Sequence, residues 1–101
     1  MPQAQEKPRH QILLETLKTV TEKSYPITNL GEWVVDRGFH KSNATIIRAQ
    51  GWVAKKGGTK HDKGCYIWVG PEPTFEMADD LRVMSNFYIS GRETGIENRR
   101  G

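Results

Sequence analysis

Residues 42–53, with the sequence SNATIIRAQGWV, change from a helical to a strand-forming pattern at a single glycine. Ser42 is a residue type that favours the N-cap of a helix, and the residues after it predict a short helix over 43–50. Gly51 is suited to end that helix, because glycine adopts left-handed backbone angles without a steric penalty. The bulky residues that begin at Trp52 then favour a strand. This stretch therefore predicts a helix that leads directly into a strand.

Two further helices are predicted upstream of this stretch. Residues 9–23 place Leu13 and Leu17 on one face at helical spacing, which indicates an amphipathic helix. Residues 30–37 predict a second helix, which begins after an N-cap at Asn29. The segment between these helices contains a proline and is expected to be extended.

A β-hairpin with a cationic loop is predicted downstream. Residues 52–56 (WVAKK) and 65–69 (CYIWV) favour strands, and the glycine-rich sequence of residues 57–64 (GGTKHDKG) connects them. Alternate side chains of a strand point to opposite faces, so Tyr66 or Trp68 is expected at the surface.

The rest of the chain predicts one more helix, over residues 74–89. Its apolar stripe would either pack against the domain or pair with a second copy in a homodimer. The stripe consists of Met77, Leu81, Met84 and Tyr88. Residues 91–101 contain few apolar side chains and are expected to form a disordered tail, and residues 1–8 a flexible arm.

Positive charge is concentrated in the middle of the chain. The formal net charge is +3, but residues 40–64 carry six basic residues against one acidic residue. Residues 71–101 have four basic residues and six acidic ones. The central positive field is expected to attract phosphates or the acidic surface of a partner.

The order of these elements resembles the winged helix-turn-helix superfamily over residues 9–70. Residues 42–53 carry the likeness, because in that superfamily the recognition helix passes into the wing hairpin at this point. The resemblance implies an α+β fold with a three-helix core plus a β-hairpin wing, and here with an additional C-terminal helix. It also implies sequence-specific binding of double-stranded DNA by a small regulator of transcription or replication, such as a repressor that occupies an operator.

The residues expected to contact DNA lie on the predicted third helix and on the wing. A helix fits the major groove of DNA, where arginine reads guanine and asparagine reads adenine. Arg48 and Asn43 are therefore expected to face base edges, on the same side of the molecule as the wing. The full predicted set is Lys41, Ser42, Asn43, Ala44, Thr45, Arg48, Lys55, Lys56, Lys60, His61 and Lys63.

Two other binding functions fit the same charge pattern. One is an adaptor that binds an acidic protein, and the other is a module that binds RNA or single-stranded nucleic acid. A DNA binder that makes several phosphate contacts would lose affinity steeply with salt, which makes salt dependence a cheap discriminator.

Catalysis finds little support in the sequence. The three histidines fall on separate predicted elements, and the glycine-rich loop lacks the spacing of a phosphate-binding loop. Cys65 is the only cysteine, so neither an internal disulfide nor a cysteine-based zinc site is possible. We therefore expect no enzyme activity, cofactor or metal. The N-terminus has no signal-peptide pattern and no apolar run suits a membrane span, so a cytoplasmic protein without a membrane partner is expected.

Overall fold

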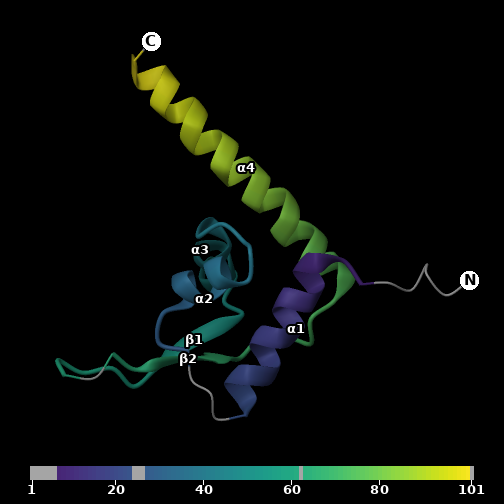
Figure 1. Ribbon diagram of the computed structural model, residues 1–101, viewed down its shortest axis with the longest axis vertical. Helices are drawn as coiled ribbons and strands as arrows, with labels where there is room; N and C mark the ends of the chain where they lie inside the picture. Colours follow the sequence, from purple (N-terminus) through teal and green to yellow (C-terminus); the bar gives the residue numbers. More distant parts are fainter. Residues whose placement is uncertain (1–6, 24–26, 62, 101) are drawn as a thin grey trace, which may run out of the picture.

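Three helices, a β-hairpin and a fourth helix follow one another along the chain (Figure 1). The structure, a computed structural model, describes residues 7–23, 27–61 and 63–100, with side chains described as far as Phe87. Its elements are α1 (Arg9–Glu22), α2 (Leu30–Asp36), α3 (Ser42–Ala49), β1 (Val53–Lys56), β2 (Cys65–Trp68) and α4 (Phe75–Arg100). This small α+β domain, with four helices and a two-stranded antiparallel hairpin in the described residues, is compatible with a winged helix.

The N-terminal helices form where their sequence patterns predict them. The Pro8 carbonyl accepts the Gln11 and Ile12 N–H groups at 3.0 and 3.1 Å, so the proline stands just before α1. The Asn29 side chain accepts the Glu32 N–H at 3.0 Å, which confirms the predicted N-cap of α2. Most of the predicted N-terminal arm, residues 1–6, lies outside the described residues.

One hydrophobic core joins the elements. α1 contributes three leucines, α2 contributes Leu30 and Val34, and α3 contributes Ile46 and Ile47. Trp52 is also buried in this core, as its place in an apolar strand start predicts, whereas Trp33 is half-buried and packs against it. Burial of these apolar side chains is the main force that fixes α3 within the domain.

The predicted hairpin forms, and its antiparallel register runs from Val53 opposite Trp68 to Lys56 opposite Cys65. The outer edge of β2 is also paired. The Tyr66 N–H donates to the Ile27 carbonyl at 2.8 Å, and the Trp68 N–H donates to the Thr21 hydroxyl of α1 at 3.2 Å. The extended piece before α2 and the end of α1 thus cover an edge that would otherwise expose backbone donors.

α4 is longer than the sequence pattern predicts. The predicted helix over 74–89 and disordered tail over 91–101 differ from the structure, in which α4 continues to Arg100. No proline follows Pro73, so no residue sterically interrupts the helical hydrogen-bond ladder. α4 packs on α1 and α3 near its start, and its far end projects away from the other elements (Figure 1). Neither α4 nor another helix in the described ranges combines the length and apolar character that a membrane span requires.

Candidate functional site

The exposed face of α3 carries three of the residues expected to contact DNA. Lys41, Thr45 and Arg48 are all exposed, and their spacing of four and three residues places them on one side of the helix. The opposite side of α3 is anchored in the core through Ile46 and Ile47, which are both buried. α3 is therefore fixed with a small, polar and cationic face toward solvent.

The sequence prediction was wrong for the start of α3. Asn43 and Ala44 were expected to face outward, and Ser42 to contact DNA from the helix cap, but the exposed fractions of Ser42, Asn43 and Ala44 are only 3%, 3% and 4%. Ser42 does not cap the helix either, because it is the first helical residue and its hydroxyl has no hydrogen-bond partner. The Ser42 N–H instead donates to Nδ1 of His40 at 3.1 Å, so the imidazole of His40 satisfies the first amide.

α4 is the reason that Asn43 is buried. The Asn43 amide group donates to the His40 carbonyl at 3.1 Å, and its oxygen accepts from the Ser85 hydroxyl of α4 at 2.6 Å. The helical period itself carried a signal for this burial, because Asn43 stands three and four positions before Ile46 and Ile47. Asn43 is thus a structural link between α3 and α4, not a group that reaches a base edge.

The wing residues are exposed as expected. The hairpin loop projects beyond the helices, where a large partner can approach it (Figure 1). The exposed cationic and imidazole side chains of the wing are Lys55, Lys56, Lys60, His61 and Lys63. Tyr66 is half-buried, and the Lys55 ammonium lies 4.7 Å from the centre of its ring, a cation–π contact at the base of the wing.

A hollow of about 250 Å³ connects the exposed face of α3 with the base of the wing. Its wall on α3 includes Lys41, Thr45 and Arg48, and Tyr66 closes it on β2. Thr28 and the start of α2 form the remaining side. The hollow therefore joins the cationic face of α3 to Tyr66, whose ring the Lys55 ammonium contacts at the base of the wing. We call this surface, which comprises the exposed α3 residues, the hollow and the wing, the α3–wing face.

The basic side chains of this face have no anionic partner in the described part of the chain. None of the salt bridges between described residues involves a lysine or arginine of α3 or the wing. Unpaired surface cations keep their full attraction for external anions. Thr28 and Asn29, which sequence analysis did not assign to the site, add polar groups to the wall of the hollow.

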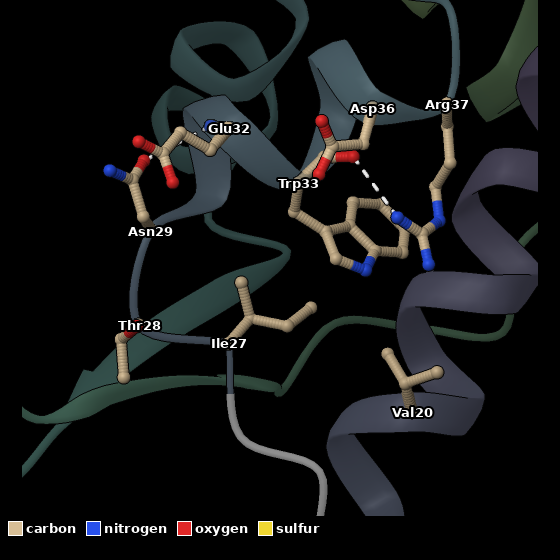
Figure 2. A pocket seen from close by; sticks show the side chains of 8 residues that line it. All are labelled: Val20, Ile27, Thr28, Asn29, Glu32, Trp33, Asp36 and Arg37. Carbon is tan, nitrogen blue, oxygen red and sulfur yellow. Dashed lines mark hydrogen bonds between the residues drawn. The ribbon is translucent and has the colours of Figure 1, made fainter.

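A second hollow, of about 460 Å³, has a net negative charge, because two carboxylates and one guanidinium, that of Arg37, line it (Figure 2). It lies between the end of α1 and one side of α2, and Glu32 and Asp36 project from α2 beside Trp33. Val20 and Ile27 form an apolar part of its lining. These carboxylates repel phosphates, so this hollow does not extend the anion-binding surface.

The apolar stripe of α4 packs against the domain, which is one of the two roles predicted for it. Leu81 is fully buried in the core, and Met77 and Met84 pack against it. These three side chains are therefore occupied within the chain, while the side chain of Tyr88 lies outside the described residues.

Within the described ranges, no cluster of three His, Cys, Asp or Glu side chains is placed to hold a metal ion. His10, in α1, lies against the Phe39 ring and Asn43, whereas His61 is in the wing loop. Comparison with family models, curated proteins and solved structures gives no match, so the interpretation of the site rests on the residues described above.

Proposed function

We propose that the chain is a winged helix-turn-helix protein that binds double-stranded DNA through the α3–wing face. The observation that carries this proposal is the hollow that joins the exposed residues of α3 to Tyr66 of the wing. It supports a single continuous contact surface with a recognition helix and a cationic arm. A small regulator that acts by occupying an operator would need no more than this surface.

The dimensions of α3 suit the major groove. Its residues Ser42–Ala49 form a helix about 12 Å long, which corresponds to roughly three to four base pairs of DNA. Arg48 is exposed and suited to bidentate contact with guanine, and the methyl group of Thr45 suits contact with thymine. Lys41, at the N-terminal end of the same face, is placed to contact a phosphate.

The wing supplies contacts that do not depend on base sequence. Lys60 and Lys63 lie in the projecting loop, where they would follow the phosphate backbone or reach the minor groove. With about five phosphate contacts over the whole face, the logarithm of the binding constant should fall with the logarithm of salt at a slope of about −4.5. An adaptor that reads a shaped acidic protein surface would not bind random duplexes with such a slope.

Two sets of substitutions test the proposal. Arg48→Ala should cost about 1–3 kcal/mol on a selected site and relax base preference at one position. Lys60→Ala combined with Lys63→Ala should weaken selected and random duplexes alike, and reduce the salt slope by about 1 for each lysine. Binding is measured by fluorescence anisotropy with duplexes obtained by selection from a random pool. Glu32→Gln, on the acidic hollow, is the control and should leave the salt slope unchanged.

The proposal is wrong if the chain selects no duplex and shows no salt-dependent binding to random DNA. Tighter binding to single strands, with quenching of tryptophan fluorescence, would assign the same surface to single-stranded nucleic acid instead.

A further inference from the structure

A third hollow lies between α1 and the turn that connects α2 with α3. It has a volume of about 240 Å³ and is lined by Arg9, Ile12, Leu13, Thr16, Arg37 and Phe39. Ile12 is 49% exposed although it is fully apolar, and Phe39 is half-buried. We call this hollow the α1–turn groove. It shares no lining residue with the hollow of the α3–wing face.

Two arginines flank the apolar floor of this groove. The guanidinium carbon of Arg9 lies 4.6 Å from the centre of the Phe39 ring, and that of Arg37 lies 4.1 Å from the centre of the Trp33 ring. Figure 2 shows the Arg37 guanidinium between Trp33 and the ribbon of α1. Stacking uses the face of a guanidinium and leaves its N–H edge for other bonds.

The N–H donors of both arginines are largely unused. Arg37 donates one hydrogen bond to the Trp33 carbonyl at 3.2 Å. Neither Arg9 nor Arg37 forms a salt bridge with a carboxylate in the described part of the chain. A guanidinium has five donors in a fixed plane that matches the geometry of a carboxylate. The groove therefore offers anion recognition at its rim and an apolar surface beneath it.

We propose that the α1–turn groove binds a small carboxylic acid with one apolar group, such as an arylalkanoate. The apolar group would cover Ile12 and Phe39, and the carboxylate would accept hydrogen bonds from Arg9 and Arg37. The groove is smaller than the roughly 300–1,000 Å³ of pockets for drug-sized ligands, which suits a single ring with a short acidic chain. A phosphate would bind the arginines but leave the apolar floor in water, so it uses only half of the site.

The test is a titration of the full ¹⁵N-labelled chain with 3-phenylpropionate, followed by NMR. Saturable shifts are expected at the groove residues, with a Kd of about 1 mM or tighter for a ligand of this size. The uncharged 3-phenylpropanol lacks the carboxylate, and inorganic phosphate lacks the apolar group. Both should therefore bind at least about tenfold more weakly than 3-phenylpropionate.

Three variants assign the contacts. Arg9→Gln and Arg37→Gln should each weaken 3-phenylpropionate at least about tenfold, because each removes a charge-assisted hydrogen bond. Arg48→Gln removes the same charge from the exposed face of α3 and should leave the Kd unchanged. Ile12→Asp places a carboxylate on the floor at an exposed position, where folding tolerates it, and should abolish binding even if an arginine variant fails to fold.

Three results would overturn the proposal. The first is the absence of saturable shifts at the groove. The second is binding of the alcohol or of phosphate with the same Kd as 3-phenylpropionate. Such a result would show that the carboxylate or the apolar group, respectively, does not contribute to binding. The third is an effect of Arg48→Gln as large as that of Arg9→Gln, which would indicate attraction by net charge alone.

Discussion

Asn43 links α3 to α4. Its amide bonds to the His40 carbonyl and the Ser85 hydroxyl, and the residue is 3% exposed. Asn43→Ala leaves buried polar groups without partners and should lower the free energy of unfolding by about 2 kcal/mol. Thr45→Ala, on the exposed face of the same helix, should change it by less than about 0.5 kcal/mol. Urea denaturation measures both effects, and a stable Asn43→Ala variant with altered base preference would show that this amide reads DNA.

His10 makes the stability of the fold depend on pH. Burial, and then the nearby charges of Arg9 and Arg82, lower the pKa of His10 below its ordinary value of 6.5, although a hydrogen bond with Asn43 acts in the other direction. The unfolded chain therefore binds a proton at this residue more readily than the folded chain. Stability should be retained above pH 6.5 and decrease as the pH falls from 6.5 toward the lowered pKa. Urea unfolding between pH 5 and 8 measures this change.

The variant His10→Gln should lose this part of the pH dependence. His61→Gln, which removes an exposed histidine from the wing loop, is the matched control and should follow the unsubstituted chain. Equal pH profiles for His10→Gln and the unsubstituted chain would show that other groups govern the acid sensitivity.

Residue patterns predicted the elements of this chain better than the faces of its third helix. The N-cap of α2 and the end of α3 depend on local chemistry, so Asn29 and Gly51 were assigned correctly, whereas Ser42 was wrongly assigned as the N-cap of α3. The burial of Asn43 depends on α4, which packs there from far along the sequence. Local patterns do not identify the partner in such a contact, although the spacing of Asn43 from the buried isoleucines indicated that its side chain faces the core.

Two glycines with left-handed backbone angles, Gly51 and Gly64, have different roles in the hairpin. Gly51 has a φ of +77° and open space where a Cβ would stand, whereas Gly64 has a φ of +75° and would place a Cβ 2.8 Å from the backbone of Lys56 and Gly58. Gly51→Ala should therefore cost only the conformational penalty of about 1–2 kcal/mol. Gly64→Ala adds a backbone clash and should cost more, with a visible change in the hairpin.

Urea denaturation and the NMR shifts of β1 and β2 distinguish these two substitutions. A larger loss of stability for Gly51→Ala than for Gly64→Ala would contradict this assignment of the two roles. DNA binding provides a second readout, because a disturbed hairpin no longer presents Lys60 and Lys63 in a fixed relation to α3.

The whole molecule separates its charges between surfaces. The α3–wing face is cationic, while Glu32 and Asp36 on the far side of α2 line an acidic hollow. The sequence predicted an excess of positive charge in residues 40–64, but not that an acidic hollow would lie on α2. That property follows from the way α2, α3 and the hairpin share one core, a long-range arrangement that no local pattern specifies.

α4 belongs to the same cooperative unit as the rest of the domain. Leu81 has no exposed surface and lies in the core with residues of α1 and α3. Leu81→Ala should therefore lower the free energy of unfolding by about 2–5 kcal/mol. The loss should appear in one transition that far-ultraviolet circular dichroism and tryptophan fluorescence report at the same urea concentration. Val83→Ala, on the exposed face of α4, is the matched control and should change stability by less than about 0.5 kcal/mol.

If Leu81 instead served mainly to pair two chains, Leu81→Ala would shift the sedimentation coefficient toward a smaller species and leave the unfolding of the diluted chain unchanged. Because α4 also holds Asn43 through Ser85, loss of its packing should loosen the start of α3 and weaken DNA binding without any change on the α3–wing face itself.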